Sequence, residues 1–189
     1  ACVVLVRSDV YVSSENISEE IEMSGLHIGH RQPFPDNRTR PCAIAIVKMK
    51  LKGYTADYVI ASSHSDHNIA WRNPKNVQEA LSYFHQKLDE RQRKKGDPTP
   101  ANLVWGGDFN AGLLTESGDS TCYWMDGDKQ IPVTTVDMPL AQRTHDLGRV
   151  DWIISTAGKP KEYKAIANPS DHLLVYEKMR AHVFVDANK

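Results

Sequence analysis

Apolar and polar side chains alternate over residues 44–51, and the alternation stops at Gly53. A second apolar run follows at residues 58–60 and leads into the polar sequence SSH, which ends at His64. Alternation with a period of two is typical of a half-buried strand, and two such runs around a glycine predict a hairpin. We therefore expect a sheet in which His64 lies at the end of a strand.

The other apolar runs predict a strand-rich α/β organisation with one clear helix. Apolar residues at positions 77, 80, 81, 84 and 88 have helical spacing and predict a helix over residues 76–95, before Gly96. We interpret the basic run at 91–95 as a solvated helix end favoured by the helix dipole, not as a phosphate patch. The further predictions are strand pieces at 3–6 and 10–12, a polar surface excursion over 13–40, strands at 103–105 and 152–154, irregular chain over 112–148, and a turn with two strand-like runs within 168–185.

The composition indicates one globular domain without a global field. The 189 residues are 40% hydrophobic and 25% charged, with 23 basic and 24 acidic residues and a formal net charge of -1. A charge this close to zero excludes general attraction to nucleic acid or anionic membrane, so any phosphate binding must be local. No apolar run approaches the roughly 18 residues that a membrane span requires.

The beginning of the chain and its cysteines bear on compartment and completeness. The chain starts on the apolar run ACVVLV without methionine or a signal pattern, and we expect an upstream segment to be missing. Cys2, Cys42 and Cys122 lack metal-ligand spacing and leave two alternatives, which are one disulfide with one thiol or three buried thiols. The compartment therefore stays open at this point.

The stretch LVWGGDFNAG places two polar residues at the end of a short apolar run. The run closes on Gly106 and Gly107, as a core strand does before a tight turn, and Asp108 and Asn110 follow. Residues two apart in an extended chain face the same way, so these side chains form a site-like pair. An Asx turn, in which both side chains only satisfy nearby backbone groups, is the alternative.

Polar and titratable groups recur at the predicted strand ends. They are His64, Asp108, Asn110, Asp151, Asp171 and His172. A shared cleft explains their repeated placement, and two imidazoles with three carboxylates suit metal-assisted phosphoester hydrolysis. Carboxylate oxygens favour a hard cation such as Mg²⁺, with Ca²⁺ or Mn²⁺ as other choices. His67 lies three residues after His64, but no third nitrogen or thiolate ligand is near, so we do not predict zinc.

The ordered motifs SSH, GDFN, RVDW and SDH extend this pattern over most of the chain. In this order and spacing the sequence resembles the endonuclease/exonuclease/phosphatase superfamily, whose fold is that of deoxyribonuclease I. Within it, the segments RPCAIAIV and RTHDLGRVDWII look most like the catalytic B subunit of cytolethal distending toxins and secreted deoxyribonucleases. The resemblance implies an α+β fold, a four-layer αββα sandwich of two mainly antiparallel sheets, formed by residues 1–189 as a single domain.

The resemblance also implies roles for the residues in the four motifs. His64 would polarise or protonate the phosphate or leaving oxygen, and Asp108 would orient the attacking water. Asn110 would hold the phosphoryl oxygen. Asp171 would bind metal, with Asp108 as a second metal ligand.

The remaining roles concern the second imidazole and the phosphate contacts. His172, aligned by Asp151, would complete the acid/base or transition-state contacts. Further phosphate contacts are expected from Arg72, Thr144, His145 and Arg149. For Arg72 and His145 an ordinary surface position is the open alternative.

One departure from the family pattern concerns the start of the fold. Family members begin with a strand that bears an asparagine, followed by a segment whose glutamate is the main metal ligand, and both would precede residue 1 here. Glu15, Glu19, Glu20 and Glu22 are in the wrong place for that ligand. The chain is thus expected to be the C-terminal two thirds of the fold, completed by an upstream segment or a partner chain, or to be inactive.

The expected activity is that of a Mg²⁺-dependent endonuclease that cleaves DNA. The sequence GDFNA has the nuclease form, and residues 111–112 do not match the pair typical of the inositol phosphatases of the superfamily. A phosphoinositide phosphatase and a catalytically inactive binding module on the same scaffold are the alternatives. The resemblance to toxins and secreted enzymes favours a secreted protein but leaves the compartment unknown.

Overall fold

A computed structural model describes residues 2–19, 42–51, 53–64, 74–108, 122–135, 151–157, 162–166 and 174–178, to which the statements below refer. The elements in chain order are β1 (Tyr11–Asn16), β2 (Cys42–Leu51), β3 (Tyr54–His64), α1 (Pro74–Lys95), β4 (Asn102–Asp108), β5 (Tyr123–Asp126), β6 (Lys129–Pro132), β7 (Thr134–Thr135), β8 (Asp151–Ser155), β9 (Glu162–Ile166) and β10 (Leu174–Lys178).

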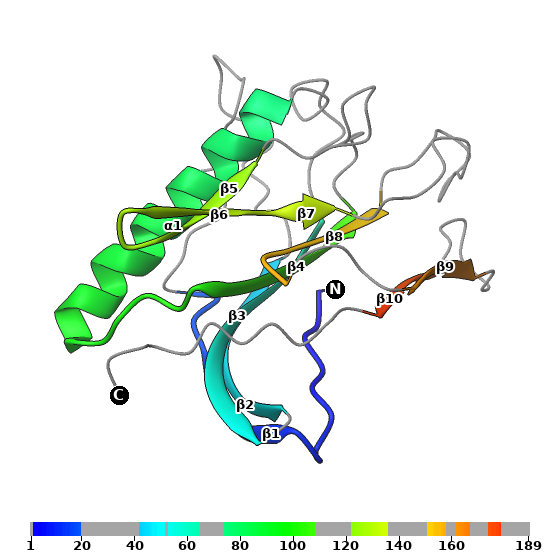
Figure 1. The fold of residues 1–189 in the computed structure, drawn as a ribbon, viewed down its shortest axis with the longest axis horizontal. Helices are drawn as coiled ribbons and strands as arrows, with labels where there is room; N and C mark the ends of the chain where they lie inside the picture. Colours follow the sequence, from blue (N-terminus) through cyan, green and yellow to red (C-terminus); the bar gives the residue numbers. More distant parts are fainter. Residues whose placement is uncertain are drawn as a thin grey trace.

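A six-stranded sheet with the order β1-β2-β3-β4-β8-β7 forms the centre of the described structure (Figure 1). Its neighbouring strands pair antiparallel, except that β3 and β4 are parallel. Parallel neighbours need a crossover connection, and α1 lies between β3 and β4 in the chain. Two smaller antiparallel sheets consist of β5 with β6 and of β9 with β10.

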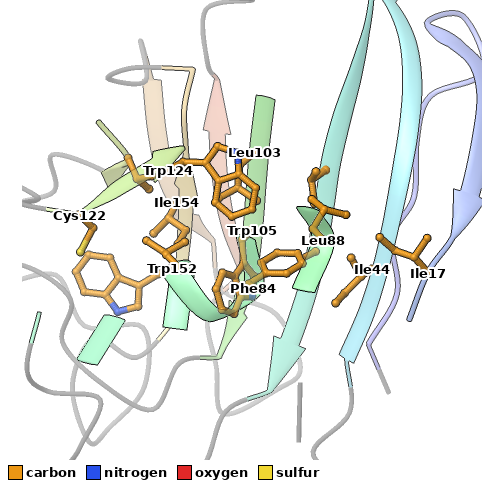
Figure 2. Close-up of a cluster of buried hydrophobic side chains, with 14 residues drawn as sticks. Ile17, Ile44, Phe84, Leu88, Leu103, Trp105, Cys122, Trp124, Trp152 and Ile154 are labelled. Carbon is orange, nitrogen blue, oxygen red and sulfur yellow. The ribbon is translucent and has the colours of Figure 1, made fainter. Parts of the chain in front are cut away.

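Helix α1 packs its apolar side on one face of the central sheet. Phe84 lies in the middle of this contact, with its ring centroid 5.7 Å from that of Trp105 on β4 and 5.5 Å from that of Trp124 on β5. Figure 2 shows these rings within one buried cluster that extends from Ile17 to the region of β8. Burying aromatic rings of this size against one another provides much of the driving force for joining helix, sheet and hairpin.

The α+β sandwich class predicted from the sequence is confirmed in this form, as a strand-rich mixed structure with a helix packed on a sheet. The predicted hairpin is β2 and β3, which pair along their whole lengths from Cys42 opposite Ser63 to Leu51 opposite Tyr54. The predicted helix corresponds to α1. In the part of the chain that the structure describes, no helix has the length and apolar character needed to cross a membrane.

The predictions for the N-terminal segment were wrong in two respects. Residues 3–6 do not form a strand, and the Leu5 side chain is 89% exposed, because none of the described strands pairs with this apolar run. The predicted surface excursion begins too early, because β1 continues to Asn16 and pairs with β2. Ile17 then enters the core, and the Ser18 hydroxyl accepts a hydrogen bond from the Ile44 amide at 2.9 Å.

Part of the region predicted to be irregular is regular structure. β5 and β6 form a hairpin in which Asp126 pairs with Lys129 around a two-residue turn. Gly127 begins this turn with a φ of 56°, a left-handed conformation that glycine adopts at little cost. A Gly-Asp pair between two strands is a hairpin signal that the sequence contained. β9 was likewise missed, since its sequence EYKAI has no strong apolar alternation.

The basic end of α1 is exposed at Arg93 and Lys95, as the sequence indicated, but Arg91 is buried. Arg91 is only 8% exposed, and its Nη2 atom donates to Glu15 Oε1 on β1 at 2.7 Å. The Lys95 ammonium pairs with the same Glu15 oxygen, and Arg93 pairs with Asp89 at 2.6 Å. These ion pairs therefore tie the helix to the edge strand β1 or to its own preceding turn.

The Glu15 ion pair makes a prediction about acid stability. Hydrogen bonds from Arg91 and Lys95 lower the pKa of the Glu15 carboxyl from 4.5 to about 2. Because the folded-state pKa is depressed, the ionised carboxylate stabilises the fold above pH 4.5, and this contribution disappears as the pH falls toward 2. Glu15→Gln should lower the free energy of unfolding at pH 7 by about 1 kcal/mol, the value of a charge-assisted hydrogen bond reduced for solvent exposure.

Urea unfolding of both proteins between pH 2 and pH 7 measures this difference. Glu90→Gln is the matched control, because Glu90 forms an exposed pair with Lys87 on α1 at 3.4 Å and such surface pairs contribute little. A Glu15→Gln variant that keeps the acid-dependent loss of the wild type would show that this pair does not govern acid stability.

His85 makes a second prediction, at the contact between α1 and β5. Its ring lies edge-on to Trp124 with centroids 5.0 Å apart, and its buried Nε2 atom lacks a hydrogen-bond partner among the described residues. Burial lowers the pKa of His85 below 6.5, although Asp89 and the Met125 backbone oppose that shift. Below pH 6.5 the unfolded chain therefore binds a proton more readily than the folded one. The free energy of unfolding thus decreases as the pH is lowered.

The variant His85→Phe removes this titration while keeping an aromatic ring against Trp124. We expect its free energy of unfolding to decrease less than that of the wild type between pH 7 and the lowered pKa, as measured by urea titration at several pH values. Equal decreases in both proteins would contradict the assignment.

Candidate active site

The ends of three neighbouring strands, β3, β4 and β8, lie together at one end of the central sheet. β3 and β4 are parallel, so their C-terminal ends lie together, and His64 pairs with Asp108 in register. β8 runs antiparallel to β4 and begins at the same end of the sheet, where Asp151 pairs with Asp108. The fold thus brings three of the predicted site residues onto neighbouring strands at one level of the sheet.

These three residues lie on the face of the sheet opposite α1. Directly paired residues project to the same face, and neighbours along a strand project to opposite faces. Trp105 packs against Phe84 of α1, and so Asp108, three residues further along β4, belongs to the other face. His64 and Asp151 share that face through their pairing with Asp108.

His64 and Asp108 are in direct electrostatic contact. The His64 Nε2 atom is 3.5 Å from Asp108 Oδ2, within ion-pair distance if the imidazole is protonated. The His64 side chain is 44% exposed and can meet a substrate, whereas Asp108 is 16% exposed. A carboxylate shielded from water and close to an imidazole can orient the ring and stabilise its charged form.

The carboxylates at these strand ends suit a hard divalent cation with few protein ligands. Asp108 and Asp151 present oxygen donors on adjacent strands, and Mg²⁺ is often held by one or two carboxylates with several waters. Among the residues that the structure describes, no group of three or more His, Cys, Asp or Glu side chains surrounds a metal position. Carboxylate oxygens of this kind are ligands that Mg²⁺ accepts together with water and phosphate oxygens.

The other predicted site residues lie outside the described residues. They are Arg72, Asn110, Thr144, His145, Arg149, Asp171 and His172. The expected convergence of His64 with His172, and the alignment of His172 by Asp151, therefore stay predictions.

Two residues that the sequence did not single out, Ser63 and Gly107, lie directly behind these strand ends. Ser63 and Gly107 pair in register immediately before His64 and Asp108. The Gly106-Gly107 doublet, which by sequence alone indicates the end of a strand, instead lies within β4, which continues to Asp108. This doublet was the available signal that two backbones approach closely next to the site.

No protein-family model matches this sequence, and no curated protein matches it significantly. An endonuclease/exonuclease/phosphatase family protein from Bacteroides thetaiotaomicron is similar in structure, with a TM-score of 0.48 and 18% identity over 89% of this chain and 64% of its own. A mannosyl-6-phosphatase from the same organism aligns with a TM-score of 0.47 and 17% identity over 92% of this chain and 68% of its own.

TDP2 from D. rerio, in complex with a single-strand DNA product, aligns with a TM-score of 0.44 and 16% identity over 89% of this chain and 67% of its own. The present chain therefore spans about two thirds of the length of these three structures. We rest the functional proposal on the residues of this chain, because all three TM-scores are below 0.5.

The paired carboxylates predict measurable binding of magnesium. Asp108→Asn should weaken Mg²⁺ affinity at least about tenfold, because an amide oxygen replaces a charged ligand. Isothermal titration of the folded proteins with Mg²⁺ measures the change. Asp57→Asn on β3 is the matched control, since Asp57 pairs with Lys48 at 3.9 Å at the other end of the strand. Equal affinities of wild type and Asp108→Asn would contradict the assignment.

Proposed function

We propose that this protein is a divalent-metal-dependent phosphodiesterase that cleaves DNA. The observation that supports the proposal most is the register of three strands, which sets His64, Asp108 and Asp151 at one level on one face. These residues come from the motifs SSH, GDFN and RVDW, which resemble those of one hydrolase superfamily in order and spacing. The nuclease form GDFNA favours a phosphodiester substrate over an inositol phosphate.

The chemistry of phosphodiester cleavage matches what the His64 and Asp108 pair can do. The half-exposed His64 imidazole can donate a hydrogen bond or a proton to a phosphoryl or leaving oxygen. The Asp108 carboxylate accepts hydrogen bonds only, so it can orient an attacking water and hold the imidazole. The pair thus offers a proton donor and a hydrogen-bond acceptor beside the position proposed for the phosphate.

A divalent cation would supply charge stabilisation for the phosphoryl oxygens. Asp108, Asp151 and Asp171 are the carboxylates that would hold it or align the groups around it. Asn110 is proposed to donate its amide to a phosphoryl oxygen, and His172, aligned by Asp151, to stabilise the transition state. Arg72, Thr144, His145 and Arg149 are proposed as phosphate contacts.

The nearly neutral chain limits how DNA would be held. With a net charge of -1, the protein has no general attraction for a polyanion, so contact depends on cations near the site. We propose few phosphate contacts and thus a shallow dependence of binding on salt concentration. We also propose that residues 1–189 belong to one domain whose metal site is completed by an upstream segment or a partner chain. A relation to secreted nucleases and toxin B subunits is the narrower form of this proposal.

The direct test is cleavage of a supercoiled plasmid by the full-length protein. We expect nicking with Mg²⁺, none with a chelator, and recovery when Mg²⁺ is restored. His64→Ala and Asp108→Ala should each lower kcat by about 100-fold to 10,000-fold, the usual contribution of a general acid or base. The control Asp57→Asn should cleave like the wild type.

The outcomes separate the three kinds of protein. Release of phosphate from phosphoinositides without plasmid nicking would replace the nuclease proposal with a phosphatase. A folded full-length protein that neither hydrolyses these substrates nor binds Mg²⁺ would be a binding module, and the enzymatic proposal would be wrong.

A further inference from the structure

The peptide that joins Ser63 to His64 lies directly against Gly107. Ser63 and Gly107 pair in the parallel β3–β4 ladder, and a Cβ atom at Gly107 would overlap the Ser63 carbonyl oxygen and lie 2.9 Å from its carbonyl carbon. Gly107 also has a φ of 150°, which side-chain-bearing residues rarely adopt. Only glycine therefore allows the two strands their observed approach at this position.

A buried hydrogen bond fixes the same point from the side of α1. The Trp105 indole Nε1 donates to Ser63 Oγ at 2.8 Å. Trp105 is fully buried and packs against Phe84 of α1, so its ring has little freedom to move. Ser63 is thereby held through its side chain by Trp105 and through its backbone by Gly107.

The next residue on each strand belongs to the candidate active site. His64 follows Ser63, Asp108 follows Gly107, and both project to the face opposite α1. Their 3.5 Å separation is that of an ion pair and is longer than an N–H···O hydrogen bond, so a small increase in strand separation would weaken the contact. The spacing of the pair thus depends on what holds Ser63 against β4.

We propose that Ser63, Trp105 and Gly107 are positioning residues that set the separation of the His64 imidazole from the Asp108 carboxylate. This inference rests on the proposed phosphodiesterase function for its catalytic consequence. The hydrogen-bonding groups of Ser63 and Trp105 do not touch the substrate in this account. They act through the backbone, on the side of the sheet away from the reaction.

The first test removes the hydrogen bond without creating a clash. Ser63→Ala and Trp105→Phe should each lower kcat for plasmid nicking by about 10-fold to 100-fold with little change in KM, because a displacement of 1 Å can cost about 100-fold. The double variant should lose about as much as either single variant, since both remove the same bond. Ser63→Thr, which keeps the hydroxyl, should recover most of the activity.

Two matched controls separate positioning from general stability. Trp124→Phe removes another buried indole hydrogen bond, from Nε1 to the Pro100 carbonyl at 3.1 Å, and should lower the melting temperature without changing kcat. Gly106→Ala adds a Cβ to the neighbouring residue, where the nearest atom is Ile153 Cγ1 at 3.5 Å, and should be tolerated. Gly107→Ala should lose activity or fail to fold.

Crystal structures decide the geometry independently of activity. In Ser63→Ala the His64 Nε2 to Asp108 Oδ2 distance should increase by about 1 Å, whereas Trp124→Phe should leave it unchanged. An unchanged distance in Ser63→Ala would overturn the inference, whether or not the wild type is active. Full kcat in an active Ser63→Ala variant would also overturn it while leaving the phosphodiesterase proposal intact. A wild type inactive on every phosphoester would instead overturn the function, and with it the catalytic consequence of this positioning.

Discussion

The parallel pairing of β3 with β4, made possible by α1, is the constraint on which the candidate site depends. A hairpin would have sent β4 back in the opposite direction and placed Asp108 away from His64. The crossover through α1 instead brings the C-terminal ends of β3 and β4 to the same end of the sheet, where the antiparallel β8 begins with Asp151. The geometry of the site is thus a consequence of chain topology before any side-chain interaction is considered.

Helix α1 is held in this crossover by contacts at several points along its length. Phe84 packs between Trp105 of the central sheet and Trp124 of the β5–β6 hairpin, and the buried Arg91 pairs with Glu15 on the sheet edge. The same Trp105 that buries the helix also bonds to Ser63 behind the site. Packing on one face of the sheet is therefore linked mechanically to the spacing of polar groups on the other.

The sequence predicted the elements with strong periodicity and the strand ends that bear site residues. Apart from the β2–β3 hairpin, it did not show which segments find a pairing partner. The apolar run at residues 3–6 pairs with none of the described strands, whereas EYKAI pairs with β10. It also did not indicate that Arg91 is buried, because the matching charge on Glu15 lies 76 residues away. Nor did the sequence indicate that position 107 must be glycine, because the atoms that exclude a Cβ there belong to the Ser63 backbone on another strand.

We predict that His64 and Asp108 act as one unit in metal-dependent phosphodiester cleavage. A double-mutant cycle on kcat/KM for plasmid nicking, with His64→Ala, Asp108→Ala and the double variant, measures their coupling most directly. Residues that act as a unit are strongly non-additive, so the double variant should be little slower than the slower single variant. Losses that multiply independently in the double variant would contradict the central claim.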